Sequence, residues 1–414
     1  MRTAALRRGA AALLVALAAA LGGAPSTGRA QEGGGVAAGP FPQIAGEAWM
    51  GLYTVGPYQA SDRERRGSST FLFGEVLGGI YVSPTVSLQG IIHVEPVGEV
   101  DPNGTNTFFR YQGAYLEGLY LNWQAADALR LYAGKFNAPF GYGHHYFPGI
   151  LPRIRAHEVY LIRESVGFGA AWTFLSHPFW GEHDLSAALF TFDTSFLSNT
   201  AFTRKRCCEE GFERYRRNVL HQGGAGNNGR LENVAVALDG DRIAWLPNFS
   251  YHLALLSRGP GKGGTRREWG YAAGARYLAR WTPEVRTLFF GEYVEFQNYG
   301  GQPFEAGPES SGEDVEAVAA AEASALRERR RFSTLGAQTT YGPWRATVAW
   351  QRDERKRNID TLPTEQYLEV SAGRELLWGF GIDIGYQYAK YARDDGTGGR
   401  SNAIVSRLGF QRAF

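Results

Sequence analysis

Residues 380–389 read FGIDIGYQYA, and the two parities of this segment have opposite character. One parity carries Phe380, Ile382, Ile384, Tyr386 and Tyr388, and the other carries Gly381, Asp383, Gly385, Gln387 and Ala389. Side chains of a strand point alternately to opposite faces, so this alternation predicts a β-strand with one aromatic, apolar face and one small, polar face. Residues 404–414, IVSRLGFQRAF, repeat the pattern with Phe410 and Phe414 on the apolar side.

Two folds accommodate such a hairpin. A water-soluble sandwich buries the apolar face in a core. An outer-membrane barrel turns that face towards lipid and keeps the polar face inside. An aromatic residue at the last position, here Phe414, is common in bacterial barrels of this kind.

The N-terminal segment has the pattern of a secretory signal peptide. Arginines precede an apolar run, residues 10–21, and small residues around Ala30 suit a cleavage site. We therefore expect a signal peptide over residues 1–30, a periplasmic leader over 31–43 and a barrel domain over 44–414. Removal of Arg2, Arg7, Arg8 and Arg29 would change the net charge from +2 to −2. So weak a charge gives no support to a nucleic-acid partner.

The composition favours a barrel over a helical enzyme. The chain has 54 glycines and 14% aromatic residues, and its mean hydropathy is −0.29. No later segment has enough consecutive apolar residues for a transmembrane helix, so a membrane-spanning form has to be a closed barrel.

Alternation and turn residues predict about sixteen strands, an even number as in single-chain bacterial barrels. They fall at residues 44–55, 70–82, 86–95, 109–123, 129–137, 165–175, 183–192, 231–238, 249–256, 268–281, 285–296, 332–341, 344–351, 366–376, 380–389 and 404–414. Long connections alternate with short ones, as expected for long external loops and tight periplasmic turns. The predicted exceptions are a short connection near residue 102 and a longish turn at 239–247. In the fourth strand, Glu117 shares the parity expected to face lipid, an exception that the pattern does not explain.

Two further segments lack a clear role. The adjacent Cys207 and Cys208 cannot clamp the fold, and idle thiols are the simplest interpretation, with a vicinal disulfide or a metal contact as alternatives. Residues 313–329 are rich in Ala, Glu and Arg, which predicts a short helix.

The stretch Gly134-Lys135-Phe136-Asn137-Ala138-Pro139-Phe140-Gly141 resembles a motif of the phosphate-selective porin O/P family. The structural alternative is a strand end followed by a Pro-Gly turn. The resemblance implies a sixteen-stranded porin, usually a homotrimer, with its third outer loop folded inside as a constriction. That loop would be residues 138–164. It has no lysine after Lys135 to match the family's lysine cluster, so the resemblance does not extend to phosphate specificity.

Charged residues in this loop and on the polar strand faces are the candidate site residues. We expect His144, His145, Arg153, Arg155, His157 and Arg163 at the constriction. The expected pore-lining residues are Arg110, Lys135, Arg276, Arg280, Arg345, Asp383 and Arg407. Cationic groups in a narrow throat would favour anions, because pore-lining charges set selectivity. The alternatives are solvated loop charges and structural networks of arginines and acids. Phe410 and Phe414 are the expected assembly signal.

The sequence therefore predicts an outer-membrane porin of a Gram-negative bacterium that passes small hydrophilic solutes with a modest anion preference. Its partners would be membrane lipid and the solutes themselves. No cofactor or metal site is expected, since adjacent histidines without a third ligand are weak evidence. Signatures of hydrolases, nucleotide-binding loops and haem attachment are missing, so an enzyme is not expected. The alternative function is a barrel scaffold that sheathes a periplasmic or electron-transfer partner.

Overall fold

A computed structural model describes residues 40–97, 102, 104–200, 202–203, 220, 224–261, 264, 266–301, 328–357, 362–393 and 396–414. The predicted signal peptide, residues 31–39 of the predicted leader, Cys207 and Cys208 lie outside these residues. So does most of the predicted helix at 313–329, whose last two residues instead begin a strand.

The described chain is almost entirely antiparallel β-sheet. The strands are β1 (Gln43–Ala60), β2 (Ser68–Tyr81), β3 (Val86–Pro96), β4 (Asn106–Phe108), β5 (Gln112–Ala126), β6 (Leu129–Phe136), β7 (Ser165–His177), β8 (Gly181–Phe192), β9 (Phe202–Thr203), β10 (Asn233–Asp241), β11 (Phe249–Arg258), β12 (Glu268–Arg280), β13 (Val285–Gln297), β14 (Glu328–Tyr341), β15 (Trp344–Arg357), β16 (Glu365–Glu375), β17 (Phe380–Ala392) and β18 (Gly398–Ala413). The helices are η1 (Arg63–Arg65), α2 (Gly143–Tyr146), α3 (Pro152–Tyr160), η2 (Phe196–Ser198) and η4 (Leu377–Gly379).

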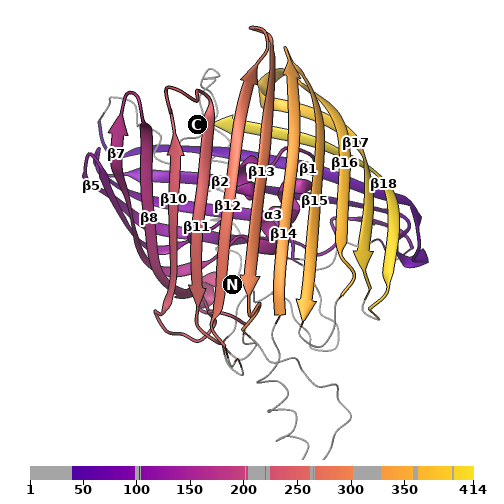
Figure 1. Cartoon of the computed structure of the whole chain (residues 1–414), viewed down its shortest axis with the longest axis horizontal. Helices are drawn as coiled ribbons and strands as arrows, with labels where there is room; N and C mark the ends of the chain where they lie inside the picture. The colour runs from indigo at the N-terminus through magenta and orange to yellow at the C-terminus, as the bar shows by residue number, and fades with distance from the viewer. Residues whose placement is uncertain are drawn as a thin grey trace, which may run out of the picture.

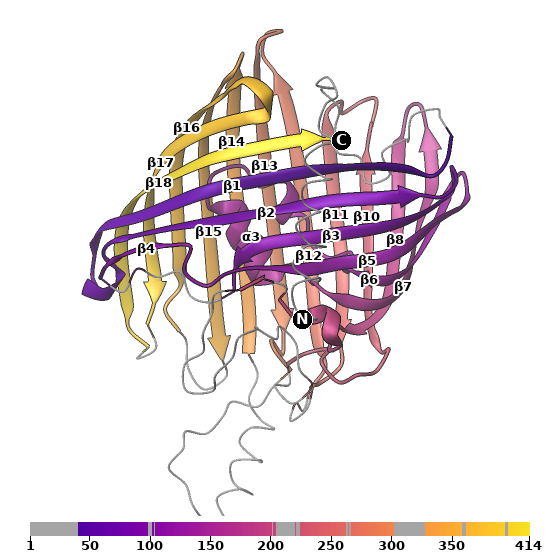
Figure 2. The ribbon, with the colours of Figure 1, turned by 180° about the vertical axis from the view of Figure 1, so that it is seen from behind.

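Sixteen of these strands form one closed wall. Each pairs with its neighbour along the chain, and β18 pairs with β1 from Glu47↔Ala413 to Ala60↔Ser401. Figures 1 and 2 show this wall from opposite sides, with α3 inside it. The short strands β4 and β9 are additions to β2 and β5. The predicted closed barrel of about sixteen strands is thus confirmed.

The final hairpin has the predicted faces. Ile382 and Ile384 on β17 are exposed on the outside, whereas Asp383 and Gln387 are buried inside. No helix in the described part of the chain is long and apolar enough to cross a membrane.

Two expectations about β5 and the segment that precedes it were wrong. The connection after β3 is not short, because it contains β4 and continues to Gln112. The odd-numbered residues of 109–117 were expected to face lipid, but those on β5 do not, because a β-bulge interrupts the register. At the bulge, Ile91 pairs with Gly118 but Ile92 pairs with Leu116. The extra residue, Glu117, reverses the parity of the preceding segment. Tyr115 and Glu117 are therefore buried inside, which accounts for the acid in an apparently outward series.

The seam between the chain ends leaves no room for a side chain at Gly46. The backbones of Gly46 and Phe414 exchange two hydrogen bonds of 2.9 Å. A Cβ on Gly46 would lie 2.3 Å from the Leu77 carbonyl oxygen and 2.7 Å from Cζ of Phe414. At Gly56, on the same strand, the nearest atom would be 3.7 Å away.

Gly46→Ala is therefore expected to destabilise the barrel by about 1–3 kcal/mol, the usual cost of overpacking. Gly56→Ala is the matched control and should fold as the wild type does. Urea titrations of folded and unfolded bands in cold electrophoresis would measure both. Equal midpoints for the two variants would contradict a tightly closed seam.

Candidate functional site

The connection between β6 and β7 lies inside the barrel, and we call residues 137–164 the inner loop. It carries helices α2 and α3, and α3 appears within the wall in both views of the ribbon (Figures 1 and 2). Its backbone and side chains bond to strands β13, β15 and β16, far away in the sequence.

One buried carboxylate on β13 holds the first half of the inner loop. Glu292 accepts hydrogen bonds from the backbone N–H of Tyr142 (2.8 Å) and of Gly143 (2.9 Å). It also accepts one from the Tyr160 hydroxyl at 2.5 Å. Burial and the Glu292 charge raise the pKa of Tyr160 well above its ordinary value, so the phenol keeps its proton and remains a donor.

A second carboxylate, on β16, holds the middle of the loop. Glu369 accepts from the N–H of Ile150 (2.5 Å) and of Leu151 (3.0 Å), at the start of α3. These N–H groups have no partner within the short helix, so a carboxylate at this end stabilises it. Together, Glu292 and Glu369 fix the inner loop against one side of the wall.

Apolar packing continues the attachment on two sides of the lumen. Phe140, Ala156, Tyr160 and Ile162 belong to a buried cluster with wall residues from β8 to β14. Ile150 and Leu151 pack against Tyr53, Phe71 and Phe73 on β1 and β2. The loop therefore spans the lumen between these two parts of the wall.

The motif that resembles the porin O/P family builds the base of the inner loop. A Cβ on Gly134 would lie 2.5 Å from the Leu119 carbonyl oxygen, so only glycine fits there. Gly141 has φ +69°, a left-handed conformation that turns the chain into the lumen. Phe136 and Phe140 are both buried in the apolar cluster.

Lys135 faces inward but does not offer its ammonium to a channel, because it is only 2% exposed. Its Nζ lies 2.8 Å from Glu164 Oε1 and 2.8 Å from Asp193 Oδ2, and it donates to the Leu197 carbonyl at 3.0 Å. Burial alone would raise the pKa of Asp193, but hydrogen bonds from Lys135 and Ser195 lower it below its ordinary value. Lys135 thus fastens both ends of the inner loop to the segment after β8.

Arg153 and Arg155 of α3 project towards β1, β16 and β17. The guanidinium of Arg153 lies 3.9 Å from the Trp49 ring centroid, and its Nε donates to the His144 carbonyl. Arg155 lies 3.2 Å from the Tyr367 ring centroid. Neither forms an ion pair with any residue that the structure describes. Their positive charges are therefore not neutralised by a direct ion pair within the described residues, and they face aromatic rings instead.

Arg345 and Arg407 share one carboxylate on the same side of the lumen. Asp383 Oδ1 lies 2.6 Å from Arg345 Nε, and Asp383 Oδ2 lies 2.7 Å from an Arg407 nitrogen. The three residues lie on β15, β17 and β18, and their summed charge is +1. They continue the cationic surface that Arg153 and Arg155 begin.

The other predicted pore-lining arginines lie elsewhere. Arg276 on β12 packs over the Tyr146 ring at 3.9 Å and donates to Ser250. Arg280 is exposed at the end of β12. Arg110 is not on a strand: it lies in the turn before β5, stacked on Tyr111.

The four remaining loop residues have different environments. His144 is buried, and burial together with neighbouring cationic groups lowers its pKa well below the ordinary value, so it is uncharged at neutral pH. His145 is exposed. His157 and Arg163 lie on the opposite side of the loop from Arg155, against β2, β3 and β5. The six residues expected at one constriction therefore form two groups.

His157 joins a buried cluster of titratable side chains that the sequence did not reveal. Glu75 on β2, His93 on β3 and Glu117 on β5 converge on it, and one ligand atom of each lies within 4.8 Å of the others. The bulge at Glu117 turns that carboxylate inward. This cluster is the one place described here where residues could hold a metal ion with four ligands.

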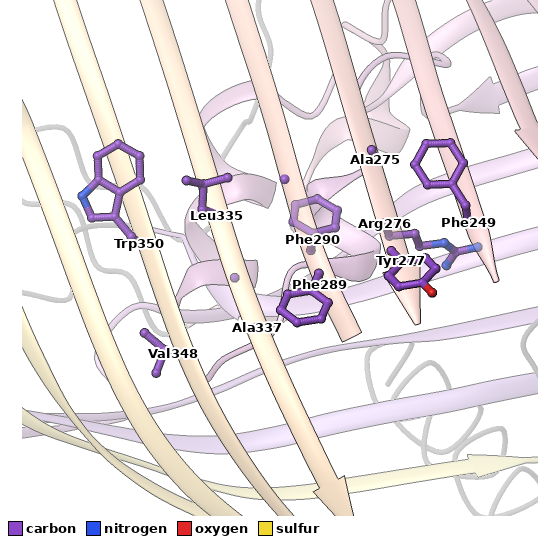
Figure 3. Close-up of a pocket in the computed structure, with 12 residues that line it drawn as sticks. Phe249, Ala275, Arg276, Tyr277, Phe289, Phe290, Leu335, Ala337, Val348 and Trp350 are labelled. Carbon is purple, nitrogen blue, oxygen red and sulfur yellow. The ribbon is translucent and has the colours of Figure 1, made fainter. Parts of the chain in front are cut away.

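The outer surface has a groove of about 500 Å³ across β11 to β15. Figure 3 shows Tyr277, Phe289, Leu335, Val348 and Trp350 among its lining residues. Four of these apolar or aromatic side chains are exposed, and the most exposed is Leu335, at 57%; the others are Tyr277, Phe289 and Val348. A groove with such a lining does not suit a hydrophilic solute.

Comparisons with known proteins bear on the fold. No protein-family model matches the chain, and no curated protein matches its sequence. The outer membrane channel DcaP of Acinetobacter baumannii is similar in structure, with a TM-score of 0.50 and 11% identity over 89% of this chain and 96% of that one. An anion-selective porin from Comamonas acidovorans aligns with a TM-score of 0.47 and 10% identity over 90% and 99% of the two chains. At so low an identity, the likeness to DcaP bears on the fold alone, and it agrees with a closed antiparallel barrel.

Proposed function

We propose that the chain forms a passive channel in the outer membrane of a Gram-negative bacterium, with a modest preference for small anions. The observation that carries this proposal is the inner loop, which brings Arg153 and Arg155 into the lumen beside Arg345 and Arg407. Sixteen strands leave an aqueous interior rather than a packed one. The apolar residues on the outer face suit contact with lipid. Predictions that the barrel is a homotrimer, that it belongs to the porin O/P type and that it has no enzymatic activity accompany the proposal untested.

The alternative, a barrel that sheathes a protein partner, needs a free lumen. Here the inner loop spans the lumen and is bonded to β13 and β16. A channel for small solutes is therefore the better match to this interior.

The double variant Arg153→Ala/Arg155→Ala is expected to lose most of the anion preference. Two unpaired cations leave the throat, so the chloride-to-potassium permeability ratio should fall towards one. Reversal potentials across a planar bilayer in a potassium chloride gradient measure this ratio.

The matched control is Arg242→Ala, because Arg242 is an exposed arginine in the turn after β10, paired with Glu182. It should leave the reversal potential unchanged. An unchanged potential in the double variant, or an equal shift in the control, would contradict the proposed role of the α3 arginines.

A further inference from the structure

The cluster of Glu75, His93, Glu117 and His157 has the dimensions of a metal site. His93 Nδ1 lies 3.3 Å from Glu75 Oε1 and 3.4 Å from Glu117 Oε2. His157 Nε2 lies 3.8 Å and 3.6 Å from the same two oxygens. Bonds of about 2.0–2.2 Å to a tetrahedral zinc ion place its ligand atoms roughly 3.3–3.6 Å apart. Three of the four contacts therefore match edges of one coordination tetrahedron, and the fourth, from His157 to Glu75 at 3.8 Å, is slightly longer.

Three of the four imidazole nitrogens of His93 and His157 lack a hydrogen bond with the described residues. His93 is fully buried, and neither of its ring nitrogens makes a hydrogen bond of acceptable geometry with a described residue. The same holds for His157 Nε2. Buried polar groups without partners are costly, and both His93 Nδ1 and His157 Nε2 lie near oxygens of Glu75 and Glu117 that a shared cation would join.

Each of the four proposed ligands also contacts another side chain, which would hold it in position. The remaining nitrogen of His93 lies 3.3 Å from Glu95, and that of His157 lies 3.0 Å from Glu158. Carboxylates in this position orient metal-binding histidines and fix their tautomer. Glu75 accepts from the Trp49 indole at 3.3 Å, and Glu117 accepts from Asn137 at 2.5 Å.

The cluster also concentrates buried negative charge. Glu75, Glu95 and Glu117 are buried within it, and Arg163, which pairs with Glu95, also pairs with Glu158. A divalent cation between the carboxylates would offset part of this charge.

We propose that Glu75, His93, Glu117 and His157 bind a divalent first-row metal ion, with Zn²⁺ as the best match, and that this ion fastens α3 to the wall. Two imidazole nitrogens favour such an ion over Ca²⁺ or Mg²⁺. Three ligands come from β2, β3 and β5 and the fourth from the inner loop, so the ion would join the loop to the side of the barrel opposite Glu292 of β13. This structural role is independent of whether the channel conducts.

Calorimetric titration of the full-length, tag-free barrel with Zn²⁺ after chelation tests the proposal. The parent protein of this experiment carries Cys207→Ser and Cys208→Ser, so that thiols cannot bind the ion, and every further variant is made in this parent. We expect one Zn²⁺ per barrel, and visible absorption of bound Co²⁺ typical of low coordination number. His93→Gln and Glu117→Gln should abolish this binding. Glu95→Gln should weaken it by about 10–100-fold, as for other groups that orient a ligand.

His252→Gln is the matched control, because His252 also contacts the inner loop, through the Gly141 N–H at 3.1 Å, but lies outside the cluster. It should bind Zn²⁺ as the parent does. Added Zn²⁺ should raise the urea midpoint of the parent and of this control only. Absence of stoichiometric binding to the parent, or unchanged binding by folded His93→Gln and Glu117→Gln, would overturn the proposal. Either result leaves the conductance experiments unaffected.

Discussion

The double variant Glu292→Ala/Glu369→Ala is expected to raise the single-channel conductance several-fold. The two carboxylates accept four backbone N–H groups of the inner loop and the Tyr160 hydroxyl. Each buried donor left without a partner costs about 1–3 kcal/mol. If the loop stayed against the wall, five buried donors would have no acceptor. We therefore expect the loop to detach from the wall, so that water can bond these donors. Recordings in planar bilayers measure the change.

Glu295→Ala provides the control for this experiment. Glu295 lies on the same strand, β13, but bonds with Tyr293 and Arg331 rather than with the inner loop. Its removal should not alter conductance. If the double variant conducts like the wild type, the loop is not held by these carboxylates, or it does not restrict the channel.

Lys135→Met is expected to cost about 3–5 kcal/mol of barrel stability, because it leaves the buried carboxylates of Glu164 and Asp193 without their cation. Methionine keeps most of the volume and the apolar stem, so the loss reports on charge rather than on packing. The matched control is Lys390→Met on β17, since Lys390 forms no ion pair with the described residues. Urea unfolding in detergent micelles or lipid vesicles measures both variants.

The Lys135 contribution should also depend on pH. The folded-state pKa of Asp193 is below its ordinary value, so its stabilisation is fully present at neutral pH. This stabilisation is lost as the pH falls below the ordinary pKa of an aspartate and then through the lowered pKa of Asp193 in the folded state. The difference in stability between the wild type and Lys135→Met should therefore narrow in acid. A difference that stays constant down to the lowest pH at which the barrel folds would contradict this ion pair.

Alternation alone was enough to predict the wall. The β17 face with Ile382 and Ile384 is exposed, and β12 begins at the predicted residue, because a barrel strand is buried on one face only and its pattern is local. The error in β5 has an equally local cause. A bulge adds one residue without any marker in the sequence except the misplaced Glu117, and that residue was the available clue.

The interior could not be predicted in the same way. Glu292 and Glu369 are single acids on inward parities, and nothing near them indicates that they accept N–H groups from residues about 150 and 219 positions away. The proposed metal ligands do not form a recognisable motif in the sequence, because they come from three strands and one helix. The loop histidines and arginines were identified as charged residues of one segment. The separation of Arg153 and Arg155 from His157 depends on the rotation of α3, which the sequence does not specify, because the apolar residues of α3 show no dominant face.

Planar-bilayer recording of the wild-type protein across a potassium chloride gradient tests the proposed channel most directly. The arrangement of Arg153 and Arg155 beside Arg345 and Arg407 predicts discrete conductance steps and a reversal potential whose sign reports a preference for chloride. A folded barrel that gives no conductance steps, or one whose reversal potential reports a preference for potassium, would contradict it.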